Sequence, residues 1–187
     1  IFSTPSVSYK IRLQNGDVMT LYSAAKFPET QKVVEIQEPW VKLNVISAEK
    51  YLGATMKLLE EIRGKYLKTD YLGHGRMEIV YEAPLKEIIV DFYDRLKSIT
   101  EGYGSMSYEI EGFRAGNLVK LDILIAGEPN EAFANIVPRD RAHDEGRRMT
   151  AKLKEILPRQ LFSVAIQAAV GGDVIARFTG GNTEHVS

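Results

Sequence analysis

Apolar residues alternate with polar ones near the start of the chain, a spacing typical of half-buried β-strands. Residues 7–13 alternate in this way, Asn15-Gly16 offers the positive φ angles of a type I′ turn, and residues 18–22 return as a second strand. Residues 33–36 are a candidate third strand. We therefore expect a hairpin within residues 1–37, a piece too small to bury a core alone and without a partner upstream.

The next segment changes from strand to helix periodicity. Residues 41–45 alternate as a strand, and helical spacing then appears at Leu52, Met56, Leu59 and Ile62. Ser47 stands where an N-cap is needed, and Gly64 where a left-handed residue would end the helix. This predicts one strand followed by one helix packed on it.

A hairpin and a second helix follow. Residues 65–72 and 77–83 alternate around Gly73-His74-Gly75, Pro84 suits the first turn of a helix, and apolar positions at helical spacing continue to Ile99. A last strand is expected after Gly104. The order strand, helix, strand, strand, helix, strand is that of the ferredoxin-like plan, with two helices on one face of an antiparallel sheet.

From residue 118 onward the pattern predicts one helix among strands. Strands are expected at residues 119–125, 132–137 and 161–170, with a shorter one after Gly172. The helix is expected over about residues 140–157, where Pro158 ends it. A small α+β unit follows from this pattern.

Composition narrows the function classes. The 187 residues include 24 Lys and Arg against 25 Asp and Glu, so contact with nucleic acid must come from local patches and not from net charge. The absence of cysteine excludes disulfides and thiolate metal sites. No apolar run is long enough to span a membrane. The start, Ile1-Phe2-Ser3-Thr4, has no initiator methionine or signal-like order, so we expect a piece of a longer chain.

Candidate chemistry is sparse. No Gly-x-x-x-x-Gly-Lys-Ser/Thr loop occurs, so we expect no nucleotide cofactor in this chain. The three histidines, His74, His143 and His185, lie in different segments without a nucleophile motif or metal-ligand spacing. We therefore expect no catalytic, cofactor or metal residues and no enzyme activity in the chain itself.

The predicted helix after Pro138 is locally basic. Its cations outnumber Asp140, Asp144, Glu145 and Glu155 and are Arg139, Arg141, Arg147, Arg148, Lys152, Lys154 and, just beyond the helix, Arg159. Arginine forks suit phosphate oxygens, which favours RNA contact. The alternative is a solvated helix face with ion pairs between neighbouring turns. The residues alone leave both interpretations open.

Two motifs resemble a known family. The first reads Ile156-Leu157-Pro158-Arg159-Gln160-Leu161-Phe162 and continues at Ile166-Gln167-Ala168-Ala169-Val170-Gly171; the second runs from Leu118 to Pro129. Both resemble the C-terminal domain of the LepA (elongation factor 4) translation factors. Phrases of the middle segment, such as residues 96–104, look like domain V of elongation factor G and LepA. Two unrelated motifs in the right order make a chance match implausible.

The resemblance implies an α+β architecture in three parts. Residues 1–37 would be the end of domain III, residues 38–115 a ferredoxin-like domain V of the elongation factor G type, and residues 116–187 a truncated LepA C-terminal domain. The whole factor would be a ribosome-dependent GTPase acting on elongating ribosomes, in back-translocation and fidelity, with GTP bound by a domain absent from this chain.

The same resemblance implies partners and contact residues. The partners would be the ribosome, through rRNA and ribosomal proteins, and tRNA, with peripheral membrane association as an option for the whole factor. Localisation would be cytoplasmic, with the inner membrane surface or an organelle left open. It favours RNA contact by the basic helix and adds Arg63, Lys65 and Lys97 as candidates, although Arg63 could equally act as a helix-end cation.

Departures and rivals remain. After Arg177 the family continues through a basic segment, whereas Phe178-Thr179-Gly180 follows here, and Pro138 replaces a frequent histidine. A ferredoxin-fold domain of another elongation factor G type protein is one alternative. An acylphosphatase-like enzyme is another, but it would need an arginine in the loop after the first strand, where Ile46-Ser47-Ala48-Glu49 stands.

Overall fold

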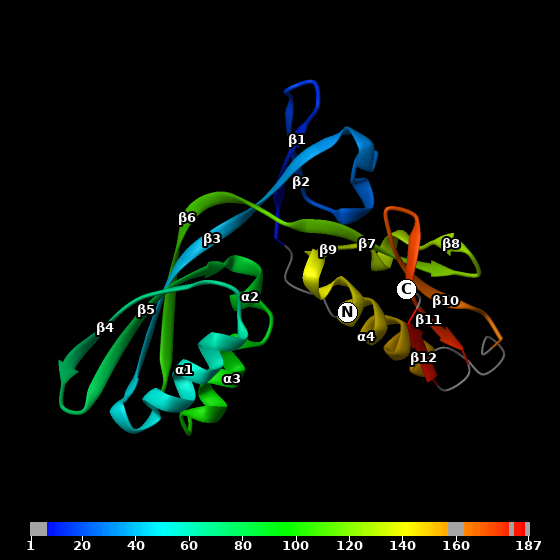
Figure 1. Cartoon of the computed structure of the whole chain (residues 1–187). Coiled ribbons are helices and arrows are strands. Elements are labelled where there is room, and N and C mark those ends of the chain that lie inside the picture. The colour runs from blue at the N-terminus through cyan, green and yellow to red at the C-terminus, as the bar shows by residue number, and fades with distance from the viewer. Residues whose placement is uncertain (1–6, 157–162, 180–181, 186–187) are drawn as a thin grey trace. The chain divides into compact units, whose positions relative to one another are not determined.

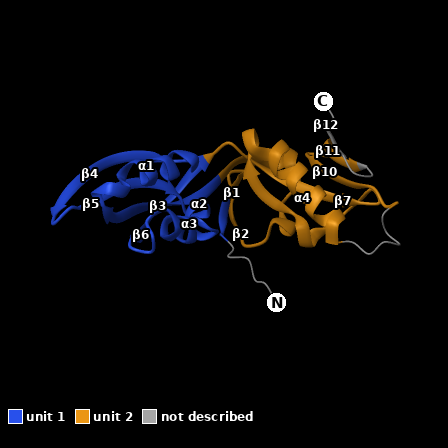
Figure 2. Ribbon diagram, turned by 90° about the horizontal axis from the view of Figure 1, so that it is seen from below, with its two compact units in different colours: residues 1–10, 37–115 blue, residues 11–36, 116–187 orange. Residues whose placement is uncertain are grey.

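The chain folds into two compact units. A computed structural model describes residues 7–156, 163–179 and 182–185 (Figure 1). Unit 1 comprises residues 1–10 and 37–115, and unit 2 residues 11–36 and 116–187 (Figure 2). Both are α+β with antiparallel sheets, which confirms the predicted class at this level. Within the described ranges, none of the helices has the length and apolar character needed to cross a bilayer.

The predicted N-terminal hairpin is present, with a different turn. Strands β1 (Tyr9–Leu13) and β2 (Val18–Leu21) flank it. Within this turn only Gly16 has a positive φ, of 89°. Its N–H donates to the Leu13 carbonyl at 2.9 Å, and the Leu13 N–H donates to the Asp17 carbonyl at 2.8 Å. This is a three-residue loop with a glycine bulge, so the type I′ prediction was wrong. The Asn15 side chain accepts from the Asp17 N–H, which holds the bulge without a second positive φ.

The third strand is longer than predicted. β3 runs without a break from Val33 to Ala48, where two separate strands were expected on either side of Glu38-Pro39. Pairing with β5 begins at Trp40, directly after Pro39. A proline has no N–H to give to a ladder, so it is tolerated at the point where pairing with the neighbouring strand starts.

Unit 1 follows the predicted element order. After β3 come a 3₁₀ turn, η3 (Glu49–Tyr51), and then α1 (Leu52–Glu61), β4 (Lys65–Gly73), β5 (Arg76–Pro84), α2 (Leu85–Ile89), α3 (Phe92–Ile99) and β6 (Ser105–Gly116). Four of its strands lie in the order β6-β3-β5-β4. The helices pack on one sheet face, where Val41, Leu43 and Val45 meet Leu59 and Phe92.

Two local predictions in unit 1, at Ser47 and Gly64, were wrong. Ser47 is a buried strand residue and caps nothing; η3 begins after Ala48 without a side-chain cap. Gly64 does not close α1, whose C-cap Ile62 is extended. A Cβ on Gly64 would lie 2.2 Å from the Glu82 carbonyl oxygen, so this glycine allows β5 to pass close by.

The second helix of unit 1 is split in two, where one continuous helix was expected. Asp91, at φ −139° and ψ 3°, leaves the helical region between α2 and α3. Ile88, Phe92 and Leu96 are nevertheless all buried, so the apolar stripe survives the break. The apolar spacing in the sequence predicted which helix face is buried, but it did not predict the break at Asp91.

Unit 2 is a sheet with one long helix. Its strands are β7 (Leu118–Ile125), β8 (Glu128–Pro129), β9 (Asn135–Pro138), β10 (Ile166–Val170), β11 (Asp173–Thr179) and β12 (Asn182–His185). They lie in the order β12-β11-β10-β7-β8, with β9 paired to β7. The turns η4 (Glu131–Phe133) and η5 (Arg139–Arg141) flank β9, and α4 (Ala142–Ile156) packs on β7, β10 and β11.

Two strand starts in unit 2 were misplaced. The returning strand begins at Asn135 because residues 131–133 form η4. β10 begins at Ile166, and Val164 precedes it, whereas alternation from Leu161 was expected. The backbone N–H of Ala126 donates to the Ala165 carbonyl, and Nζ of Lys154 donates to the Val164 carbonyl. Residues 164–165 are therefore held by these two hydrogen bonds and not by a strand ladder. Residues 157–162, with Pro158, Arg159 and Phe162, lie outside the described residues.

Candidate functional site

Helix α4 presents one buried and one exposed face. Ala142, Gly146, Thr150 and Leu153 are buried against the sheet. The opposite side carries polar residues at spacings of three and four, and these are Asp144, Arg148, Lys152 and Glu155. Arg148 and Lys152 are one helical turn apart, so their cationic groups belong to one strip. The prediction of a basic exposed helix face therefore has a structural counterpart.

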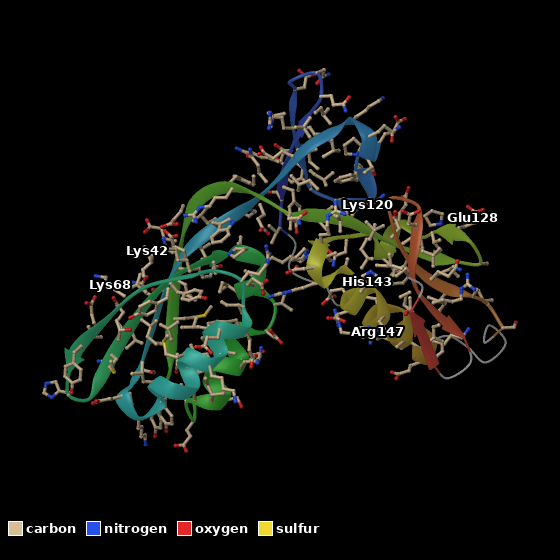
Figure 3. All side chains as sticks on the ribbon, viewed as in Figure 1. Lys42, Lys68, Lys120, Glu128, His143 and Arg147 are labelled. Atoms are coloured by element: carbon tan, nitrogen blue, oxygen red, sulfur yellow. The ribbon has the colours of Figure 1, made fainter. Side chains whose placement is uncertain are left out.

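The cations of this strip differ in how they are paired. Arg148 donates from Nη2 to Oε2 of Glu145 at 2.7 Å, and its side chain remains 64% exposed. Arg147, labelled in Figure 3, lies 3.6 Å from Asp144. In the described part of the chain, exposed Lys152 forms no ion pair. Lys152 is thus the most available cation on α4, and Arg148 is available once it releases Glu145.

The remaining cations near α4 lie at its ends. Arg139 is exposed and donates from Nε to Oδ1 of Asn117 at 3.1 Å, while its backbone N–H donates to the Asn117 carbonyl. Arg141 belongs to η5 and is half-buried. Arg159 lies outside the described residues. Arg139 therefore lies just before α4, on η5, where its bonds to Asn117 fix its position.

Lys154 does not belong to the strip. It is buried at 7% exposure, and its Nζ donates to the Val164 carbonyl at 2.6 Å. It therefore joins the last turn of α4 to the segment before β10. The segment 139–156 is left with five surface cations against four carboxylates, a smaller excess than the sequence suggested.

Arg63 is held inside an ion-pair cluster of unit 1. Its Nη1 and Nη2 donate to the two carboxylate oxygens of Glu38 at 2.6 and 3.0 Å, and its Nε donates to Glu87 at 2.8 Å. Burial acts to lower the pKa of Arg63, but the hydrogen bonds to Glu38 and Glu87 outweigh it and hold this pKa above its usual value. Burial, and then the charge of Glu38, raise the pKa of nearby Tyr9. Arg63 thus has its donors turned toward protein carboxylates.

Lys65 and Lys97 belong to unit 1 and lie on different elements. Lys65 is exposed at the start of edge strand β4. Lys97 donates from Nζ to the Gly102 carbonyl at 3.2 Å, and its Nζ lies 5.4 Å from the centroid of the Tyr93 ring. The candidate cations therefore form one strip on α4 and separate positions within unit 1.

The described residues assemble no metal centre. Among them there is no group of three or more histidine, aspartate or glutamate side chains that could hold a metal ion. His74 lies in the β4–β5 turn at φ 54°, and His143 lies on α4. The exposed cations Arg148 and Lys152 of α4 can bind an anionic partner through charge and hydrogen bonds.

The comparisons with known proteins agree on a family. A model described as elongation factor G C-terminus matches residues 35–124, and one described as GTP-binding protein LepA C-terminus matches residues 125–182. Elongation factor 4 of Thermus thermophilus is 46% identical over 96% of this chain, and that of Chlorobaculum tepidum is 46% identical over 95%. The chain belongs to the LepA (elongation factor 4) family. The resemblance noted from the two motifs is thereby confirmed.

The chain spans only part of its LepA relatives. It covers 30% of the length of the Thermus thermophilus factor and 29% of that from Chlorobaculum tepidum. A solved structure from Thermus thermophilus aligns with 25% identity over 43% of this chain and 12% of that chain, at a TM-score of 0.40. Helix α4 and its strip lie wholly within the segment that matches the LepA model.

Sequence reasoning missed one polar pair of this LepA segment. In the amide orientation that satisfies hydrogen bonding, Oε1 of Gln167 accepts from Nε and Nη2 of Arg177 at 3.0 and 2.9 Å. The two residues are opposite each other on β10 and β11. Alternation along β10 could have shown which sheet face Gln167 occupies, but no sequence signal pairs it with Arg177.

Proposed function

We propose that this chain is the ribosome- and tRNA-contacting C-terminal part of a LepA-type translation factor. Residues 38–115 act as a ferredoxin-like domain V, residues 116–187 as the LepA C-terminal domain, and residues 1–37 as the end of domain III. GTP binding and hydrolysis belong to the rest of the factor, and this part performs no chemistry. Its partners are rRNA, ribosomal proteins and tRNA.

One observation carries the RNA-contact proposal. Arg148 and Lys152 project from the exposed side of α4 one turn apart, while Gly146 and Leu153 hold the helix against a sheet. A rigid helix that presents two adjacent cations can bind neighbouring phosphates without the entropy cost of ordering a loop. Membership of the LepA family supports RNA as the partner of this helix. The element order of unit 1 supports the assignment of residues 38–115 as domain V.

Salt dependence tests this proposal. Each phosphate contact releases counterions, so the logarithm of the affinity for bacterial ribosomes should fall linearly with the logarithm of salt concentration. Lys152→Ala and Arg148→Ala should each reduce the magnitude of that slope by about one unit. Titration of ribosomes with the fluorescently labelled chain over a salt series measures the slope.

Lys57→Ala is the matched control. Lys57 is also an exposed lysine within a helix, but it lies on α1 of unit 1 and outside the proposed strip. It should leave the slope unchanged. A flat salt response of the wild-type chain, or equal slopes for the wild type, Lys152→Ala and Lys57→Ala, would contradict RNA contact by α4.

Releasing Arg148 should strengthen binding. Glu145→Gln removes the carboxylate that competes with phosphate for the guanidinium. An exposed pair of this kind is worth about 0.2–1 kcal/mol, so a ribosome affinity higher by a factor of roughly 1.4 to 5 is expected at low salt. Glu128→Gln on β8 removes the same charge at an exposed position outside α4 and measures the general charge effect. Equal gains from both variants would count against a specific role of Arg148.

A further inference from the structure

The sheet of unit 2 has a second face, opposite α4. Ile166, Ala168 and Val170 of β10 pack in the core that α4 covers. Side chains alternate along a strand, so Gln167 and Ala169 point to the other face. The motif residues of β10 therefore contribute to both faces of the sheet, and α4 covers only one of them.

Residues 24–30 cover part of this second face. Leu118, Ile136 and Ala169 alternate onto it and are 7%, 1% and 2% exposed. The turn η1 (Ala24–Lys26) contacts β9 and η4, which places this segment over the sheet. The cover is incomplete, and polar residues of β7 and β11 remain accessible beside it.

A recess of about 280 Å³ lies where the cover ends. Residues 27–30 line it together with Lys120 and Asp122 of β7 and the Gly171-Gly172 turn between β10 and β11. Its volume is just below the range for small-molecule sites, about 300–1,000 Å³, so it fits one small group. All of its lining belongs to unit 2.

The lining combines apolar side chains with both hydrogen-bonding roles. Phe27 and Pro28 contribute ring side chains to it. Nζ of Lys120 (labelled in Figure 3) lies 3.3 Å from Oδ1 of Asp122, and both side chains are only 23% exposed, so a donor and an acceptor are fixed side by side. Gly171 and Gly172 have φ of 60° and 88°, and a Cβ on either would meet nothing within 4 Å, so their backbone is open to a ligand.

We propose that this recess binds one unpaired nucleobase of an RNA, an inference that rests on the proposed function. A planar base can stack on the Phe27 and Pro28 rings while its edge receives a hydrogen bond from Lys120 and donates one to Asp122. A phosphate is disfavoured there, because Asp122 and Glu29 are both carboxylates of the lining. Phosphates instead meet Arg177, which Gln167 orients on the same sheet face.

The carboxylate gives the recess a base preference. Adenine and cytosine carry an exocyclic amino group that can donate to Asp122, whereas uracil presents a carbonyl at the corresponding position. Unstructured oligoadenylate and oligocytidylate should therefore bind more tightly than oligouridylate. Asp122→Asn should narrow that difference, since the amide is a weaker acceptor and also offers donors.

The test compares unpaired with paired RNA, using the full 187-residue chain. One probe is a short unstructured RNA containing a fluorescent purine, and the other is a fully paired duplex of the same length. Phe27→Ala should lower affinity for the unstructured RNA roughly tenfold, leave duplex affinity unchanged and abolish the change in purine fluorescence. Tyr22→Ala is the control, because Tyr22 is 78% exposed and does not line the recess.

The outcomes separate this inference from the proposed function. One outcome is that Phe27→Ala and Asp122→Asn both bind unstructured RNA as the wild type does, while Lys152→Ala still lowers the salt slope. This outcome overturns nucleobase binding in the recess and leaves the proposed RNA contact of α4 intact. An equal loss for duplex and unstructured RNA in Phe27→Ala also overturns it. Absence of binding to either RNA and to ribosomes overturns the proposed function and the recess with it.

Discussion

Replacing Gly146 with valine is expected to destabilise unit 2 strongly while unit 1 keeps its stability. A Cβ at this position would lie 2.8 Å from Cβ of Ala168, with Ile175 and Leu121 close behind, so α4 would have to move away from the sheet. Overpacking of this kind costs about 1–3 kcal/mol and occasionally more. The loss falls on the contact between α4 and the sheet, the one α-helix to sheet contact in the described part of unit 2. Hydrogen exchange of α4 amides should accelerate, whereas fluorescence of Trp40, the only tryptophan and part of unit 1, should not change.

A matched pair of glycines separates packing from helix propensity. Gly53 lies in α1, and a Cβ there meets nothing within 4 Å. Gly53→Ala should therefore raise the free energy of unfolding by about 0.5–1 kcal/mol, as alanine does in a helix. Gly146→Ala should lower it. Stabilisation by both substitutions would mean that α4 is not pressed against β10.

The order of elements was predictable because apolar spacing reports which side of a strand or helix is buried. Residues 41–45 and Leu59 showed the core face of unit 1, and residues 119–125 that of unit 2. The same spacing does not report where pairing partners change. The break at Asp91, the continuity of β3 through Pro39 and the start of β10 at Ile166 each depend on contacts from elsewhere in the chain.

The candidate site was predictable in part for the same reason. Charge counting identified the segment 139–156, and helical spacing places Arg148 and Lys152 on its exposed side. Counting could not show that Lys154 is buried on the Val164 carbonyl. It also could not show that Arg63 meets Glu38, 25 residues away in sequence, because that pairing requires α1 and β3 to be packed together.

Arg63→Met is expected to destabilise unit 1 strongly. The Glu38 side chain is 2% exposed and Arg63 is its bidentate partner, so the variant leaves a buried carboxylate without a counter-ion. Removing one partner of such a pair costs about 3–5 kcal/mol, a large share of the stability of a small domain. Urea unfolding followed by Trp40 fluorescence measures the loss, because Trp40 lies on β3 two residues after Glu38.

The double variant Arg63→Met/Glu38→Gln tests whether the unpaired Glu38 carboxylate causes that loss of stability. A neutral amide is far less costly to bury than a carboxylate, so the double variant should recover a substantial part of the stability. Arg95→Met is the control: Arg95 is also ion-paired, to Glu61, but both side chains are over 40% exposed, at 44% and 48%, and the expected loss is at most about 1 kcal/mol. Equal losses for Arg63→Met and Arg95→Met, or a double variant less stable than Arg63→Met alone, would show that burial of the Glu38 charge does not govern this cluster. Arg63 would then be available to contact RNA. The predicted result instead means that Arg63 stabilises unit 1 by joining the end of α1 to Glu38 of β3 and Glu87 of α2.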